Sequence, residues 1–288
     1  MKDWINLLRV YQYIKNLFIF LPLFFAHEIM RVELLARAGL AFVAFSMAAS
    51  AVYIFNDLHD LEEDRHHPRK KDRPLAAGRI AGPPARAVMT ALFLGGFVIV
   101  SFLGREAFFL TLVYVLINAG YTLKWKQVAI IDIFIIALGF VLRIFVGGAV
   151  TDVTIYPWIV IMTFFLALFL ALAKRRDDLL ILENGNARPR RSLGGYNVFF
   201  VQSSMVVMAA VIIVAYTMYT LSPEIMAKFH TDRLYLTTVF VLMGLLRYLQ
   251  LTFVKNDSGS PTAILLRDPM IQGAVLGWIL AFVFFIYL

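Results

Sequence analysis

Long apolar runs, separated by short polar segments, extend through most of the sequence. They cover about 14–30, 35–56, 86–104, 106–123, 128–150, 155–173, 198–220, 233–253 and 270–288. A helix needs about 20 apolar residues to cross a bilayer, and lipid offers no hydrogen-bond partners to the backbone of an open sheet edge. The pattern therefore predicts an all-α integral membrane protein with a bundle of about nine transmembrane helices.

Composition supports the same class of protein. Hydrophobic residues make up 61% of the 288 residues and charged residues only 16%, with a mean hydropathy of +0.77. A soluble domain carries about 25% charged residues. The net charge of +8 fits loops that face anionic lipid, so we expect no nucleic acid partner. The sequence has no cysteine, which excludes disulfides and thiolate chemistry.

The basic residues predict how the chain is oriented. Most of the 27 Lys and Arg fall in the N-terminal segment and in the polar segments near 57–85, 124–127, 174–197 and 254–269. By the positive-inside rule, these segments lie on the cytoplasmic side of the cell membrane. We therefore expect one multi-pass catalytic domain over residues 1–288. Its helices would surround a central cleft that opens to the cytoplasm, where the active site would lie.

A cluster of oxygen-bearing side chains marks the end of the second apolar run. It consists of Asn56, Asp57, Asp60 and Asp64. On a helix, the three aspartates fall within a sector of roughly 60°, with Asn56 at its edge. Carboxylates on one face repel each other unless a cation lies between them, and hard oxygen ligands suit Mg²⁺. The spacing predicts a Mg²⁺ site with the three aspartates as catalytic candidates; a solvated, self-neutralising loop is the alternative.

Basic residues follow this acidic cluster at once. They are Arg65, Arg69, Lys70, Lys71, Arg73 and Arg79. Such side chains bind phosphate oxygens. An acidic cluster followed by a basic one suits a Mg²⁺–diphosphate complex, and we assign Lys71 and Arg73 to the diphosphate.

Other polar residues at the predicted cytoplasmic ends of the helices are candidates for substrate binding. They are Gln12, Lys15, Asn16, Tyr121, Lys124, Asp132, Arg143, Lys174, Arg175, Arg176 and Tyr196. Asp132 and Arg143 lie inside one apolar run, where ionisable groups are functional candidates. They are about 16 Å apart along a helix, so each needs its own partner. Structural helix–helix bonds are the alternative for these two, and interfacial anchoring is the alternative for the first helix.

Several motifs resemble the UbiA superfamily of intramembrane prenyltransferases. NDLHDLEED (56–64) matches that superfamily's NDxxDxxxD, and DRHHPRKKDRPLAAGRI continues the match. The segments RVYQYIKN, YTLKWKQVAIID, GFVLRIFVGG, LALAKRRDDLLIL and RSLGGYN are similar to the decaprenyl-phosphate phosphoribosyltransferase branch. Two features depart from the family. Lys174-Arg-Arg-Asp177-Asp178 replaces the second aspartate-rich motif of typical prenyl-diphosphate users, and Val10 and Tyr13 stand where the branch usually has Pro and Trp.

The resemblance implies a Mg²⁺-dependent transferase. It would move a 5-phosphoribosyl group from phosphoribosyl diphosphate to a polyprenyl phosphate and release diphosphate, giving a lipid-linked sugar precursor for cell-envelope polysaccharide. These substrates bring roughly three or four more negative charges than prenyl transfer to a neutral acceptor, which suits the many Lys and Arg. A polyprenyl-diphosphate transferase acting on an aromatic or other small acceptor is the first alternative. A carrier of a phosphorylated lipid or metabolite is the second. The oligomeric state stays open, a homo-oligomer included.

Overall fold

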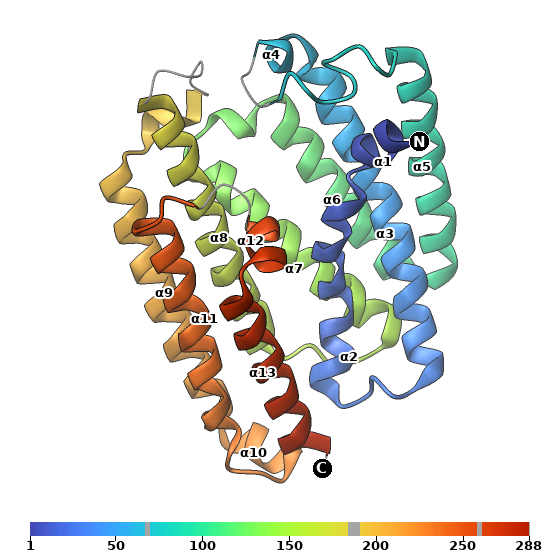
Figure 1. Cartoon of the computed structure of the whole chain (residues 1–288). Helices are drawn as coiled ribbons and strands as arrows, with labels where there is room; N and C mark the ends of the chain where they lie inside the picture. The colour runs from blue at the N-terminus through green and yellow to red at the C-terminus, as the bar shows by residue number, and fades with distance from the viewer. Residues whose placement is uncertain (67–69, 184–190, 258–260, 288) are drawn as a thin grey trace. The chain divides into compact units, whose positions relative to one another are not determined.

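The computed structural model describes residues 1–66, 70–183, 191–257 and 261–287, and every regular element in these ranges is helical (Figure 1). The chain forms two compact units, one built mainly on Met1–Ile155 and the other mainly on the residues from Tyr156 onwards. The expectation of one catalytic domain over residues 1–288 stays a prediction.

Eight of the described helical segments are long and apolar enough to span a membrane. They are α3 (Val32–His59), α5 (Gly82–Leu103), α6 (Arg105–Leu123), α7 (Ile131–Thr151), α8 (Pro157–Glu183), α9 (Val198–Thr220), η4 (Leu234–Thr237) continued by α11 (Thr238–Phe253), and α13 (Pro269–Tyr287). The all-helical membrane class is confirmed. The predicted count of nine was approximate, because the first apolar run forms a shorter, irregular segment.

That first segment is mostly a 3₁₀ helix. After α1 (Lys2–Leu8) come η1 (Val10–Phe20) and α2 (Leu21–Ala26). Every third side chain of a 3₁₀ helix returns to the same face after about 6 Å, which equals the rise of four residues in an α-helix. The repeats of η1 and α3 therefore stay in register. Tyr13 Oη lies 2.8 Å from Ser50 Oγ, and Asn16 Nδ2 donates to Ser46 Oγ at 2.8 Å.

Glycine allows η1 to lie directly on α7. A Cβ atom at Gly147 would overlap the backbone carbonyl of Ile19. Ile19 itself is fully buried. Since any larger residue would push the two backbones apart, Gly147 sets the distance between η1 and α7, and with it the position of the polar side chains on η1.

Arg37 joins the C-terminal ends of two helices in the first unit. Its Nε donates to the carbonyl of Val150 at 2.6 Å, and its Nη2 donates to that of Leu103 at 3.2 Å. Carbonyls in the last turn of a helix have no intrahelical partner, and a cation there also complements the helix dipole. Arg37 therefore caps the C-terminal ends of both α5 and α7.

Replacing Arg37 with leucine is expected to destabilise the protein by about 1.5–3 kcal/mol, the usual contribution of hydrogen bonds to a charged group. The measurement is the thermal unfolding midpoint in detergent. Arg31→Leu is the matched control, because Arg31 is exposed and reaches only Glu28, at 3.4 Å. An equal midpoint for both variants would show that the two carbonyls find other donors.

Polar side chains join several helices of the second unit. Tyr216 Oη accepts a hydrogen bond from Trp278 Nε1 at 2.6 Å and lies 2.6 Å from Thr237 Oγ1, which connects α9, α13 and η4. Arg247 on α11 pairs with Asp268 at 2.8 Å. The hydrogen bond from Arg247 lowers the pKa of Asp268, and the carboxylate also accepts the backbone N–H of Ile271 in the first turn of α13. The remaining elements are η3 (Arg191–Gly195), α10 (Pro223–Phe229) and α12 (Pro261–Arg267).

Candidate active site

The three predicted aspartates lie where α3 meets the short helix α4 (Leu61–Arg65). Asp60 separates the two helices, but the helical hydrogen-bond pattern crosses it. The N–H of Asp60 donates to Asn56 at 2.9 Å, and the N–H of Asp64 donates to Asp60 at 2.8 Å. Asp57, Asp60 and Asp64 are only 3%, 4% and 1% exposed. The carboxylates are therefore buried in protein at near-helical spacing.

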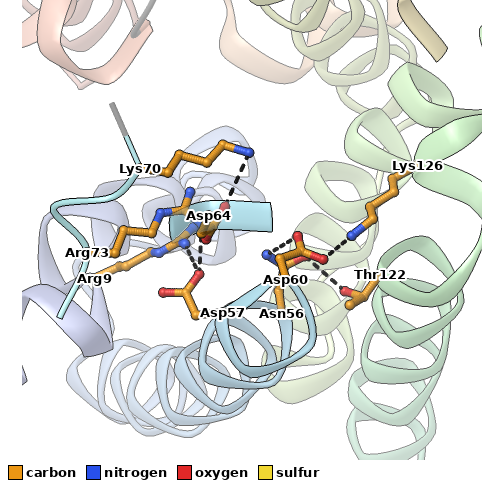
Figure 2. A network of polar contacts seen from close by, with 9 residues as sticks. All are labelled: Arg9, Asn56, Asp57, Asp60, Asp64, Lys70, Arg73, Thr122 and Lys126. Atoms are coloured by element: carbon orange, nitrogen blue, oxygen red, sulfur yellow. Dashed lines mark hydrogen bonds and ion pairs between the residues drawn. The ribbon is translucent and has the colours of Figure 1, made fainter. Parts of the chain in front are cut away.

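Asp57 and Asp64 share one face and one arginine (Figure 2). Arg73 Nη1 lies 3.0 Å from Asp57 Oδ1 and 2.5 Å from Asp64 Oδ2. Arg9 Nη2 donates to Asp57 Oδ1 at 2.5 Å, and Lys70 Nζ lies 3.6 Å from Asp64 Oδ1. Three cations thus surround two carboxylates.

Asp60 faces a different set of partners (Figure 2). Its Oδ1 accepts a hydrogen bond from Lys126 Nζ, and its Oδ2 accepts one from Asn56 Nδ2 at 3.2 Å. The carbonyl of the Asn56 side chain in turn accepts from Thr122 Oγ1 at 3.3 Å. The side chains of Lys126 and Asp60 are 8% and 5% exposed, so this ion pair is largely shielded from solvent.

Local backbone geometry brings the two most distant cations to the cluster. Arg9 ends α1 in the left-handed conformation, with φ 54° and ψ 46°, and its guanidinium lies 4.9 Å from the centre of the Tyr53 ring. Lys126 belongs to the 3₁₀ turn η2 (Trp125–Gln127) that follows α6. A Cβ atom at Gly120 would lie only 2.5 Å from the Trp125 ring. Glycine therefore lets Trp125 fold back onto α6, next to the buried Lys126.

The cluster has a small positive surplus. Its three carboxylates meet four cations, Arg9, Lys70, Arg73 and Lys126. No group of three His, Cys, Asp or Glu side chains in the described ranges is arranged as a metal site. The donor atoms are nonetheless all hard oxygens, and Asp64 Oδ1 is buried without a hydrogen bond. These oxygen atoms are of the type that Mg²⁺ prefers. A bound ion would replace some of the contacts that the carboxylates make with Lys and Arg.

The other predicted residues of the first unit differ in their exposure to solvent. Lys71 and Lys124 are exposed, whereas Tyr121 is half-buried. Asp132 is fully buried and accepts the N–H of Ile133 at 2.9 Å. Gln12, Lys15 and Asn16 lie on η1, and Asn16 accepts a hydrogen bond from Arg143. Arg69 lies outside the described residues.

Four predicted residues belong to the second unit. Lys174 is exposed, whereas Arg175 and Arg176 are 1% and 3% exposed. Arg175 Nη1 pairs with Asp178 Oδ2 at 2.8 Å, and Arg176 Nη2 donates to Asn256 Oδ1 at 2.8 Å. Tyr196 is buried, with its ring centre 6.1 Å from that of Phe200. A role for these residues in substrate binding stays a prediction.

The sequence did not single out Arg9, Thr122 or Lys126, and it placed Lys70 only in a larger group of basic residues suited to phosphate. A signal for three of them was present, because Arg9 begins RVYQYIKN and both Thr122 and Lys126 lie in YTLKWKQVAIID. Lys70 and Lys71 are adjacent, and sequence alone could not decide which one turns inward.

Known proteins resemble this chain over nearly its whole length. The model of the UbiA prenyltransferase family matches residues 17–267. The decaprenyl-phosphate phosphoribosyltransferase of Corynebacterium glutamicum is 30% identical over 292 residues, which cover 99% of this chain and 86% of the relative. The decaprenyl-phosphate phosphoribosyltransferase of Mycolicibacterium smegmatis is 30% identical over 285 residues, which cover 96% of this chain and 89% of the relative. A UbiA homologue from Archaeoglobus fulgidus, solved with DMAPP and Mg²⁺, has a TM-score of 0.72 at 18% identity and 99% coverage of both chains, which shows a common fold.

Proposed function

The chain belongs to the UbiA prenyltransferase family of membrane transferases, and from this premise we propose that it moves a 5-phosphoribosyl group from phosphoribosyl diphosphate to a polyprenyl phosphate. The observation that carries the proposal is the set of four Lys and Arg side chains around three buried carboxylates. Such a site suits a highly charged donor. The relatives from Corynebacterium and Mycolicibacterium are named decaprenyl-phosphate phosphoribosyltransferases, which supports transfer of a phosphoribosyl group to a polyprenyl phosphate.

The carboxylates would hold the metal and the basic residues would hold the diphosphate. Asn56, Asp57, Asp60 and Asp64 supply oxygen ligands, and Mg²⁺ bound there would neutralise the diphosphate and stabilise it as a leaving group. Arg9, Lys70, Arg73 and Lys126 already contact the same carboxylates. Each could donate to a phosphate oxygen after a short movement of its side chain, because charge-assisted hydrogen bonds to phosphate resemble those to carboxylate.

The reaction needs no general base. The bond between C1 of the ribose and the diphosphate oxygen breaks, and a bond from C1 to an oxygen of the lipid phosphate forms. That phosphate is already anionic at neutral pH, so no proton has to be removed. Attack opposite the leaving diphosphate inverts the configuration at C1.

We place the site on the cytoplasmic side of the cell membrane. The positive-inside rule supports this side, since the segments 57–85 and 124–127 carry many basic residues. A water-soluble donor would reach the site from the cytoplasm, and the product would stay in the membrane. Supply of a lipid-linked sugar for cell-envelope polysaccharide is part of the same proposal.

A donor comparison tests this function. Purified protein with Mg²⁺ is expected to release diphosphate from phosphoribosyl diphosphate only when a polyprenyl phosphate is present. Chelation by EDTA should stop the release, and added Mg²⁺ should restore it. Release only from a polyprenyl diphosphate with an aromatic acceptor would overturn the proposal. So would transport of a phosphorylated lipid across liposomes without any chemical turnover.

A further inference from the structure

Arg143 is a buried cation with neutral partners. It is 4% exposed on α7, and its Nε donates to Asn16 Oδ1 at 2.8 Å. Its Nη1 donates to the carbonyl of Gly139 at 2.5 Å, and its Nη2 lies 3.4 Å from Tyr114 Oη. None of the described carboxylates pairs with it. Burying a charge without a counter-ion costs several kcal/mol, so Arg143 is expected to lower the free energy of unfolding.

Lys15 adds a second uncompensated charge beside it. The charges that act on the Lys15 ammonium are those of Arg143 and Arg9, and both repel it. Arg9 is neutralised by Asp57, whereas Lys15 forms no ion pair with a carboxylate in the described part of the chain. Lys15 and Arg143 together therefore carry about two positive charges that no described carboxylate balances, in a partly buried region.

An acceptor without a hydrogen bond lies on the same side of η1. Gln12 precedes Lys15 by one turn of the 3₁₀ helix, so their side chains share a face. Gln12 Oε1 is buried and accepts no hydrogen bond. A buried acceptor left without a donor costs about 1–3 kcal/mol. A ligand with a hydroxyl group next to an anionic group would satisfy Gln12 as well as the two cations.

We propose that Lys15 and Arg143 bind a phosphate monoester group of a substrate, with Asn16 as the residue that positions Arg143. This inference rests on the proposed function, in which both substrates carry such a group: the 5-phosphate of the donor and the phosphate of the lipid. A phosphate monoester has a charge of about −1.5 to −2 at pH 7, which matches the two cations. The unsatisfied Gln12 favours the donor, because its ribose offers hydroxyl groups.

The site is formed by η1 and α7, and α3 connects it to the level of the carboxylates. Asn16 contacts Ser46, and Arg9 contacts Asp57. Ser46 and Asp57 are eleven residues apart on α3, or about 16 Å. Lys15 directly precedes Asn16, which contacts both Ser46 and Arg143, so Lys15 lies near the level of Arg143. A substrate with phosphate groups at both ends fits such an arrangement.

The test uses Lys15→Gln in the full-length protein, with Lys2→Gln as the matched control because Lys2 is exposed on the same N-terminal segment. Lys15→Gln should keep or raise the thermal unfolding midpoint, since it removes a repulsion. It should raise the KM of one substrate about tenfold or more and leave kcat within a few-fold. A rise for phosphoribosyl diphosphate assigns the 5-phosphate, and a rise for the polyprenyl phosphate assigns the lipid.

Binding gives a readout that does not depend on turnover. Ribose 5-phosphate or a short polyprenyl phosphate should raise the unfolding midpoint of the wild type, and Lys15→Gln should lose this shift for the same ligand whose KM changes. Arg143→Gln should show the same loss. A lower midpoint for Lys15→Gln with both KM values unchanged would overturn the site. Absence of any turnover in the wild type would instead overturn the proposed function, so the two failures are distinct.

Discussion

Replacing Asp57 with asparagine is expected to lower turnover by about 10²–10³-fold or more, while the protein stays folded. The substitution keeps the size of the side chain but removes the charge that would hold a divalent ion and its diphosphate. Electrostatic stabilisation of a developing charge is commonly worth this much in a buried site. The measurement is diphosphate release from phosphoribosyl diphosphate with saturating lipid and Mg²⁺.

The folded state should tolerate this change because both partners of Asp57 keep other contacts. Arg73 still pairs with Asp64 at 2.5 Å, and Arg9 still lies over the Tyr53 ring. Glu62→Gln is the matched control, since Glu62 is an exposed carboxylate on the same segment that pairs with Arg65. Aggregation of Asp57→Asn in detergent would argue for a structural role. Turnover equal to that of Glu62→Gln would remove Asp57 from the metal site.

The acidic half of the site could be predicted because it depends on spacing. Asp57 and Asp64 are seven residues apart, close to two full helical turns, so any nearly helical path places them on one face. The structure shows this result directly, since one arginine reaches both. Asp60 remains buried beside them but turns to Lys126 and Asn56. Periodicity predicts which side chains share a face, and it does not predict which partner each one selects.

Apart from Arg73, which the sequence placed beside the aspartates, the basic half could not be predicted because it depends on turns. Lys124 and Lys126 are two residues apart and similar in sequence context, yet the 3₁₀ turn after α6 buries Lys126 and leaves Lys124 exposed. Arg9 reaches Asp57 from a left-handed residue that hydropathy does not detect. The first apolar run was predicted as an ordinary helix, since the pattern of apolar residues does not distinguish a 3₁₀ helix from an α-helix there.

Replacing Lys126 with methionine is expected to reduce both stability and turnover. Methionine keeps most of the apolar length of the side chain but leaves the buried Asp60 without its cation. Breaking a buried ion pair in this way costs about 3–5 kcal/mol. The loss of a phosphate ligand should lower kcat/KM by a further 10-fold or more, in the range of a charge-assisted hydrogen bond. Lys255→Met is the control, because Lys255 is exposed.

A double variant separates the two effects of Lys126. Asp60→Asn/Lys126→Met removes both charges, so its unfolding midpoint in detergent should recover most of what Lys126→Met loses. Its turnover should stay as low as that of Asp60→Asn, since the double variant lacks both the proposed metal ligand and the proposed phosphate ligand. If the double variant is no more stable than Lys126→Met, then Asp60 and Lys126 do not stabilise each other in the membrane. Recovery of turnover together with stability would mean that the pair serves the fold alone, and the diphosphate would have to bind elsewhere.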